Sequence, residues 1–274
     1  MPTQAEKAHQ FKALHQGAET LVIGNPWDAG TARILTALGF AALSTTSAGL
    51  AFTLGRRDGT ASVTRDDALA NARAIVDATP LPVAADLENG YGDSPEAAAE
   101  TIRLAAEAGL VGGSIEDASS DPNNPIYDFD HAVERIAAAT IAARVLPFPF
   151  MLVGRAENYL HGRPDLDDTI RRLQAYEAAG ADVLYAPGIT QPEDIRTVCA
   201  SVGKPVNVLM GMKGAPPLSV KELGALGVRR ISVGSGFSRA ALTAFLHAAR
   251  EVIDEGTFTF ANEALYMSEL VDLF

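Results

Sequence analysis

The sequence predicts a (β/α)8 barrel of the TIM type, formed by a single domain that spans residues 1–274. Eight short β-rich segments alternate with amphipathic helical segments at a spacing of about 20 to 40 residues, and this alternation favours a parallel sheet closed into a barrel. No linker divides the chain. Acidic residues follow several of the apolar segments, at the strand ends where such folds keep their chemistry.

The predicted strands are short and apolar, and helices separate them. The strands cover residues 21–23, 41–46, 81–86, 111–117, 150–155, 181–187, 204–210 and 228–234. The helices cover the chain up to about residue 16, then 31–40, a segment starting at 64, 95–109, 131–145, 166–180, 193–202, 219–227 and 237–256. Residues 47–59 are interpreted as a small-residue loop whose backbone N–H groups could hold an anion.

Two helix starts have recognisable caps. Thr64 with Asp67 resembles a capping box, and Ser94 followed by Pro95 is typical of an N-cap with proline at the first helical position. These caps place the third and fourth helical segments.

The chain ends in an extra helix, predicted over 262–274 within an extension that covers about 257–274. Its apolar residues Leu265, Met267, Leu270 and Leu273 need a partner surface. That surface could belong to the same barrel or to a neighbouring subunit, so the extension is an expected oligomerisation element.

Composition excludes several classes of protein. The 274 residues carry a net charge of −12, which argues against binding to nucleic acid or to anionic membranes. Cys199 is the single cysteine, so no intrachain disulfide forms. No apolar run has transmembrane length, and the polar start is unlike a signal peptide. We therefore expect a soluble, cytoplasmic protein, in which local arginines and a bound cation still permit an anionic substrate.

Four acids stand out: Asp58, Asp86, Glu88 and Glu116, in LGRRD, AADLENGYGD and GGSIEDASSD. About one βα unit separates Asp58 from Asp86 and Asp86 from Glu116, so successive strands would bring them to one barrel mouth. Gathered carboxylates repel one another unless a cation is present, and oxygen ligands suit Mg²⁺ or Mn²⁺. The alternative is that each acid caps a helix or solvates a loop.

These residues resemble the isocitrate lyase/phosphoenolpyruvate mutase superfamily. The resemblance rests on GNPWDAGTARILTALGF, LGRRD, AADLENGYGD, GSIEDAS, VGRAE and AYEAAGAD, and it covers nearly the whole chain. It implies a barrel whose last helix is exchanged between subunits of a homodimer or homotetramer. It also implies Mg²⁺ or Mn²⁺ and a small 2-oxo or 2-hydroxy carboxylate. The bond broken would be C–C or C–P, next to the carbonyl, through an enolate.

The resemblance also implies roles for individual residues. Asp58, Asp86, Glu88 and Glu116 match the acidic shell around Mg²⁺, with Asp86 as the direct ligand. Arg155, Glu116 and Asp58 match catalytic positions, and Arg155 would bind the substrate carboxylate or carbonyl oxygen. The alternative for Arg155 is a salt bridge at the barrel rim with Glu157 or Glu116. The implied substrate-binding residues are Thr45, Thr46, Ser47, Arg155, Asn124 and Asn207.

Departures from the superfamily pattern narrow the activity. Lyases that split isocitrate carry a K-[KR]-C-G-H loop after the I-E-D strand, and this chain has ASSDPNNPIYD there. Cys199 lies in a predicted helix and is interpreted as structural. The F-P-K-x-N lysine of mutases and phosphonopyruvate hydrolases is also replaced, near Pro122, which disfavours a phosphonate substrate.

The sequence therefore predicts a Mg²⁺-dependent carbon–carbon lyase that acts on a small 2-oxo or 2-hydroxy acid, by C–C cleavage or decarboxylation of an oxaloacetate-like substrate. Two alternatives remain open: a pseudoenzyme that binds 2-oxo acids, and a C–P bond enzyme of the phosphonopyruvate hydrolase or mutase type. A phosphate-handling barrel would need Gly234 and Gly236 to bind the ligand.

Overall fold

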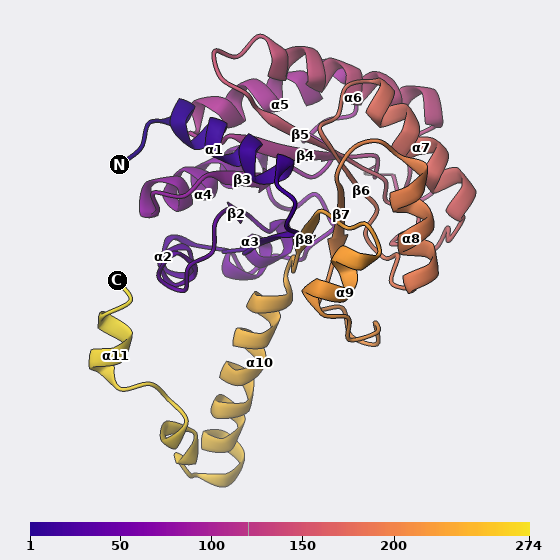
Figure 1. The fold of residues 1–274 in the computed structure, drawn as a ribbon. Helices are drawn as coiled ribbons and strands as arrows, with labels where there is room; N and C mark the ends of the chain where they lie inside the picture. Colours follow the sequence, from indigo (N-terminus) through magenta and orange to yellow (C-terminus); the bar gives the residue numbers. More distant parts are fainter. Residues whose placement is uncertain (120) are drawn as a thin grey trace.

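The structure is a computed structural model that describes residues 1–119 and 121–274. Its centre is a ring of eight parallel strands surrounded by helices (Figure 1). The strands are β1 (Leu21–Ile23), β2 (Leu43–Ser44), β3 (Val83–Asp86), β4 (Gly112–Glu116), β5 (Met151–Arg155), β6 (Val183–Tyr185), β7 (Val206–Leu209) and β8 (Arg230–Ser232). The predicted (β/α)8 barrel is confirmed.

The ring closes between β1 and β2. Seven strand pairs run continuously from β1 through β8 and back to β2. A parallel bridge then joins Gly24 to Leu43, where the N–H of Ser44 donates to the carbonyl of Gly24 at 2.9 Å. Closure leaves no free sheet edge and brings all carboxyl ends of the strands to one mouth.

Helices cover the outside of the barrel and one of its ends. They are α1 (Gln4–Gln16), α2 (Ala29–Ala37), α3 (Ser47–Thr53), α4 (Arg65–Ala78), α5 (Pro95–Glu107), α6 (Phe129–Arg144), α7 (Leu166–Ala178), α8 (Pro192–Ser201), α9 (Val220–Ala225), α10 (Gly236–Arg250) and α11 (Met267–Val271). The capping box of Thr64 and Asp67 and the Ser94 cap with Pro95 are confirmed.

The core has two layers because strand side chains alternate between the two faces of the sheet. Leu184 and Ile231 point outward and pack with the helices. Val183 and Tyr185 point into the barrel, where Phe11 of α1 packs with the same interior cluster. Helix α1 therefore closes the end of the barrel opposite the mouth.

The predicted loop at 47–59 was wrong over its first half. Residues 47–53 form α3, which begins after Thr46, and the hydroxyl of Thr46 accepts the N–H of Gly49 at 3.4 Å. Leu50 and Ala51 then pack in a small buried cluster with Val63. Burial of this apolar turn stabilises a helix that the small residues alone did not indicate.

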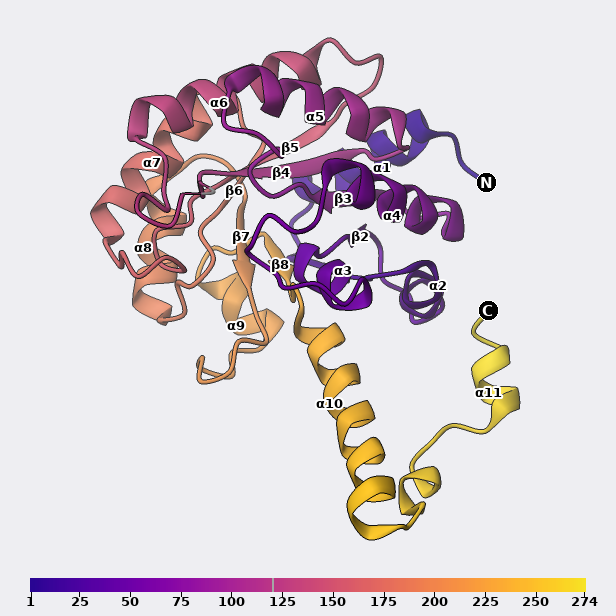
Figure 2. The ribbon, with the colours of Figure 1, turned by 180° about the vertical axis from the view of Figure 1, so that it is seen from behind.

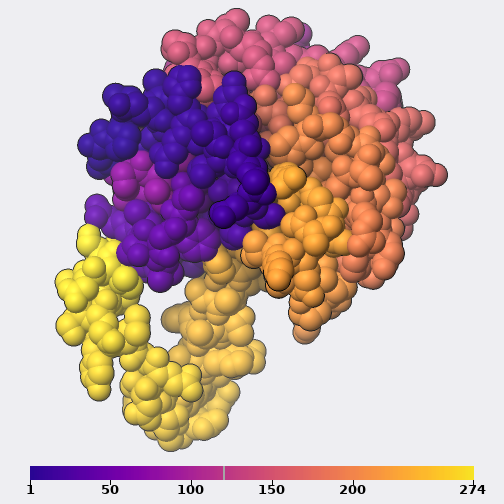
Figure 3. Space-filling model, viewed as in Figure 1, coloured from indigo at the N-terminus to yellow at the C-terminus, as the bar shows by residue number. Residues whose placement is uncertain are grey.

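The C-terminal part leaves the barrel as an arm (Figures 1 and 2). Helix α10 extends away from the strands, a π-helical turn follows at Glu251–Glu255 and a 3-10 turn at Thr259–Asn262. The arm then folds back towards α2, where Nη1 of Arg33 donates to the carbonyl of Phe274 at 2.8 Å. Figure 3 shows the arm standing off the body of the molecule.

The arm differs from its predicted form. The helix predicted over 262–274 is reduced to the five residues of α11, and the helix predicted over 237–256 ends its regular part at Arg250. Most of the arm's apolar side chains are exposed in the single chain, including Phe245 and Ile253. A segment without a packed face gains little helical stability, which explains the shorter helices.

Across the described residues, every helix is too short or too polar to cross a lipid bilayer.

Candidate active site

Three neighbouring strands deliver the charged residues of the mouth. Asp86 ends β3, Glu116 ends β4 and Arg155 ends β5, and Glu116 and Arg155 are paired in register. Nη1 of Arg155 lies 3.0 Å from Oε2 of Glu116 and 3.3 Å from Oδ1 of Asp86. The structure thus brings together two predicted acids and the predicted arginine.

Arg155 is held on three sides. Its Nε donates to Glu157 in a close ion pair, and its guanidinium carbon lies 5.2 Å from the ring centre of Tyr185. Burial by itself would lower the pKa of Arg155, but the charges of Glu116 and Glu157 raise it overall. The guanidinium therefore remains a fixed cation, and both salt bridges considered from the sequence are present.

Asp86 is hydrogen-bonded to the segment that follows β2. Its Oδ2 accepts the hydroxyl of Ser47 at 2.7 Å and the N–H of Ser47 at 3.3 Å. The N–H of Asp86 donates to the hydroxyl of Thr45 at 3.1 Å. Among the predicted substrate-binding residues of this segment, Thr45 and Thr46 are buried and hydrogen-bonded within the protein, and Ser47 faces the carboxylate of Asp86.

The acids of the mouth repel one another. Burial and the charges of Asp86 and Asp58 raise the pKa of Glu88 to about 7. Burial raises the pKa of Glu116 well above its usual range, although Arg155 opposes this effect. Asp58 lies on an exposed turn, and partial desolvation together with the charge of Asp86 raises its pKa as well. All four predicted acids are therefore close enough to be linked by electrostatic repulsion.

The donor set fits a hard divalent cation in its chemistry. Carboxylate oxygens with raised pKa values are the groups that a bound cation would stabilise in their ionised form. Within residues 1–119 and 121–274, no three acidic, histidine or cysteine side chains are arranged as a closed metal cluster. Arg155 and Ser47 instead contact both oxygens of Asp86.

The loop after β3 holds unusual backbone conformations. Glu88 has a φ of 47° and Tyr91 a φ of 57°, both in the left-handed region that side chains rarely adopt. The hydroxyl of Tyr91 is buried without a hydrogen-bond partner among the described residues. Such strain concentrates at functional sites, so the loop conformation supports a site here.

Two predicted substrate contacts lie apart from this cluster. Asn207 is buried in the barrel, where its amide donates to the hydroxyl of Ser232 at 3.0 Å. Asn124 lies on an exposed turn after β4, where its N–H donates to the carbonyl of Asp121 and its carbonyl accepts the hydroxyl of Ser119. Within residues 1–119 and 121–274, its side chain makes no hydrogen bond. The structure brings neither side chain into contact with Arg155 or Asp86.

Sequence reasoning missed several residues that shape the site. Tyr185 lies against Arg155, and Asp117 holds the main chain beside it. Glu157 entered only as a rim partner for Arg155. The I-E-D and R-A-E motifs contain Asp117 and Glu157. The sequence does not show that Glu116 faces the mouth while the next residue, Asp117, faces α7.

The chain is similar in sequence and fold to several known proteins. The sequence model of the family described as phosphoenolpyruvate phosphomutase matches residues 11–253. The chain is similar to a Burkholderia cenocepacia protein of known structure with the provisional name lyase/mutase. That chain is 58% identical, with a TM-score of 0.95, and the match covers 98% of this chain and 95% of the other.

Relatives with named activities are more distant. The 2-methylisocitrate lyase of Escherichia coli is 31% identical over 71% of this chain and 67% of its own. The oxaloacetate decarboxylase of Bradyrhizobium diazoefficiens is 30% identical over 96% of this chain and 91% of its own. A structure of oxaloacetate acetylhydrolase with its product oxalate has a TM-score of 0.88 at 26% identity, covering 100% and 95% of the two chains.

Proposed function

We propose that this chain, which belongs to the phosphoenolpyruvate phosphomutase family within the isocitrate lyase/phosphoenolpyruvate mutase superfamily, is a divalent-metal-dependent lyase. The members of this superfamily are lyases and mutases, and the chain is an enzyme of that group. It breaks the C–C bond one carbon removed from the carbonyl of a small 2-oxo dicarboxylic acid, with oxaloacetate as the first candidate. The observation that carries the proposal is a fixed guanidinium, Arg155, facing the carboxylates of Asp86 and Glu116 at the barrel mouth.

The acids at the mouth would hold Mg²⁺ or Mn²⁺. Asp86 and Glu88 are the first candidates for direct ligands of the ion, and Glu116 and Asp58 would bind it through water. The ion would act as a Lewis acid towards the substrate's carbonyl oxygen. Binding it would keep Glu88 ionised at neutral pH, where the free site would hold this carboxyl partly protonated.

Arg155 would bind the substrate and stabilise its developing charge. In decarboxylation, the C–C bond to the departing carboxylate breaks, CO₂ leaves, and the electron pair forms the enolate of pyruvate, which a proton then converts to pyruvate. The closest ion-pair contacts of Arg155 use Nε and Nη1, and Nη2 makes no hydrogen bond within residues 1–119 and 121–274. A guanidinium edge of this kind suits a carboxylate or an enolate oxygen.

The loop at Thr45 to Ser47 would receive the second carboxylate of the substrate. Ser47 is the only one of these three residues that is not fully buried, and its hydroxyl now binds Asp86 at 2.7 Å. A metal ion that recruits Asp86 would release this hydroxyl for the substrate. Asn207 and Asn124 remain proposed contacts that need movement of their side chains.

Oxaloacetate is favoured over isocitrate-type substrates because the chain has no cysteine at the mouth. Cys199 lies on α8, where burial raises the pKa of its thiol to about 11. The departing carboxylate of oxaloacetate is β to the 2-oxo carbonyl, so its loss as CO₂ produces the enolate without an initial proton abstraction and needs no such base. The relatives named oxaloacetate decarboxylase and oxaloacetate acetylhydrolase support this choice. A 2-oxo-acid-binding protein without turnover and a C–P bond enzyme are the alternatives.

The decisive assay is pyruvate release from oxaloacetate with Mg²⁺. Arg155→Lys keeps the charge but loses the planar fork, and we expect kcat/KM to fall about 10²–10³-fold, since a lost charge-assisted contact costs about 2.7–4 kcal/mol. Arg163→Lys, at an exposed position, is the matched control and should leave the rate unchanged. Release by the parent no faster than Mg²⁺ alone would refute the decarboxylase and leave binding of 2-oxoglutarate to test the alternative.

The same family membership supports an oligomer. In this oligomer, the apolar side chains of the C-terminal arm would pack against a second copy of the chain. Phe245 is 70% exposed and Ile253 83% exposed, which is costly for an isolated monomer. A groove at β1, between α1 and the end of α2, is lined by Leu14, Val22 and Phe40 and offers an apolar surface. Deleting residues 257–274 should produce aggregate or unstable monomer in sedimentation. A soluble, folded monomer would contradict the exchange of helices.

A further inference from the structure

Asp117, the residue after Glu116, is buried behind the mouth. Its Oδ1 accepts the N–H of Glu157 at 2.8 Å. Its Oδ2 accepts the hydroxyl of Tyr176 at 2.6 Å and lies 3.1 Å from Nη1 of Arg172. Both oxygens are therefore occupied by donors from the segment after β5 and from α7, and the carboxylate serves the protein's own framework rather than a ligand.

The main chain of Asp117 also binds the segment that carries Arg155. Its N–H donates to the carbonyl of Arg155 at 3.1 Å, while its side chain holds the N–H of Glu157. These two bonds fix the peptide groups on both sides of Ala156. The side chains at either end of that segment form the Arg155–Glu157 ion pair, so Asp117 sets the base from which both project.

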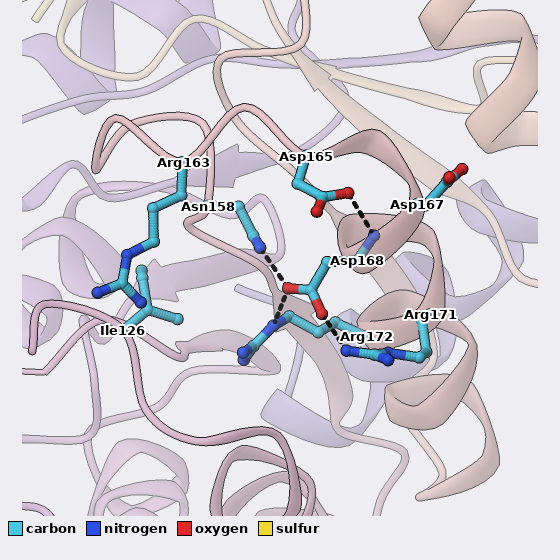
Figure 4. Close-up of a pocket in the computed structure, with 8 residues that line it drawn as sticks. All are labelled: Ile126, Asn158, Arg163, Asp165, Asp167, Asp168, Arg171 and Arg172. Atoms are coloured by element: carbon cyan, nitrogen blue, oxygen red, sulfur yellow. Dashed lines mark hydrogen bonds and ion pairs between the residues drawn. The ribbon is translucent and has the colours of Figure 1, made fainter.

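A second acid holds the next residue. Asp168 of α7 accepts the amide of Asn158 at 2.7 Å and Nε of Arg172 at 2.8 Å. Figure 4 shows Asp168 between these two side chains, at the wall of a polar pocket of about 410 Å³. Arg172 therefore connects Asp117 with Asp168. The resulting network holds residues 155–158 through Asp117, which follows β4, and through Asp168 of α7.

The network is sheltered from water. Glu157 is 3% exposed, Arg172 is 7% exposed and Tyr176 is fully buried. Hydrogen bonds and ion pairs in such surroundings are stronger and more directional than at a surface. Because Glu157 occupies Nε of Arg155, the orientation of the guanidinium fork depends on where the main chain of Glu157 is held.

We infer that Asp117 is a positioning residue that, together with Arg172 and through Glu157, sets the orientation of the Arg155 guanidinium. The inference rests on the proposed role of Arg155 in binding the substrate. It assigns a task to the last acid of the I-E-D motif that is distinct from metal binding: alignment of the cation on the neighbouring strand.

Asp117→Asn tests this assignment. The remaining oxygen can still accept the N–H of Glu157, but the new amide donors face Arg172 and Tyr176, and the negative charge is lost. We expect kcat/KM for oxaloacetate with Mg²⁺ to fall about 10²-fold, mostly in kcat, because a small displacement of a positioning group has this effect. Tyr176→Phe keeps the ion pair and is the matched control, with an expected loss below about 10-fold.

A double-mutant cycle separates positioning from general structural support. In an Arg155→Lys background there is no guanidinium fork to orient, so adding Asp117→Asn should cost less than about 3-fold. The same 10²-fold loss in both backgrounds would overturn the inference. Unfolding midpoints from circular dichroism identify a temperature at which every variant is folded, and rates are compared there. If Asp117→Asn does not fold, Arg172→Lys replaces it in the cycle.

Calorimetric binding of oxalate with Mg²⁺ keeps the test independent of turnover. The four proteins of the cycle should show the same non-additivity in Kd for oxalate. Non-additive oxalate binding without oxaloacetate turnover would sink the decarboxylase and support the positioning role. Additive effects on oxalate Kd would overturn the positioning role even if oxaloacetate is decarboxylated.

Discussion

Two arginines of the barrel have opposite surroundings. Arg155, at the end of β5, meets the carboxylates of Asp86, Glu116 and Glu157. Arg230, at the start of β8, is 5% exposed, and its Nε and Nη1 have no hydrogen-bond partner in residues 1–119 and 121–274. Burial of a charge is costly unless it is paired, so the same residue type is stabilised at the mouth and destabilised in the interior.

The pKa values follow this difference. Acidic neighbours raise the pKa of Arg155 against the effect of burial. Burial lowers the pKa of Arg230 to about 10, and only Tyr185 opposes it. The effect extends to His15 of α1, whose pKa is lowered to about 4 by burial and by the charge of Arg230. The mouth therefore has an excess of acid suited to cations, whereas the interior has an uncompensated positive charge.

Removing one of the paired acids at the barrel mouth should have the largest effect on activity. Asp86→Ala removes the acid that contacts both Arg155 and Ser47, and we expect Mg²⁺-dependent activity to disappear together with Mg²⁺ affinity, because one hard ligand is lost. Titration calorimetry with Mg²⁺ measures the affinity. Asp254→Ala, on the exposed arm, is the control. An affinity within a factor of two of the parent would reject Asp86 as a ligand.

Titration of the buried His15 should make the free energy of unfolding depend on pH. The folded-state pKa of His15, about 4, lies below its unfolded value of 6.5, so the unfolded chain binds more protons between these values. The contribution of His15 to the free energy of unfolding should therefore fall by about 3 kcal/mol as the pH drops from 6.5 to 4. The raised pKa values of Glu88 and Glu116 act in the opposite direction, so this contribution is measured as the difference between the parent and a variant without His15. Urea unfolding of the parent and of His15→Gln measures the difference.

The exposed His9 provides the control for this pH dependence. His9→Gln should follow the pH dependence of the parent, while the difference between the parent and His15→Gln should change by about 3 kcal/mol between pH 6.5 and pH 4. Parallel curves for the parent and His15→Gln would show that His15 does not titrate in this range.

Replacing the interior cation should have the smallest effect and the opposite sign. Arg230→Met exchanges an unpaired buried charge for an apolar side chain, and we expect the free energy of unfolding to rise by at least about 1 kcal/mol. Arg229→Met removes the neighbouring exposed arginine, which donates to the carbonyl of Ala18, and should cost about 1 kcal/mol or less. A loss above about 2 kcal/mol for Arg230→Met would indicate that bound water or an anion compensates the charge.

The sequence by itself determined the barrel and the acids at its mouth. Strand and helix segments were readable because apolar periodicity and caps such as Thr64 and Ser94 depend on residues close in the chain. Asp86 and Glu116 were placed correctly because a strand's last residue reaches the mouth whatever its neighbours are. Arg155 followed the same rule on β5.

Tertiary structure alone decided how these charges are paired. The contacts of Arg155 with Asp86 and of Arg172 with Asp117 join residues far apart in sequence, and they depend on strand register and on which face a side chain occupies. The same holds for Arg230, whose interior position follows from the alternation within β8. The short helix α3 and the standing arm were also beyond local pattern, because packing decides whether a marginal helix forms.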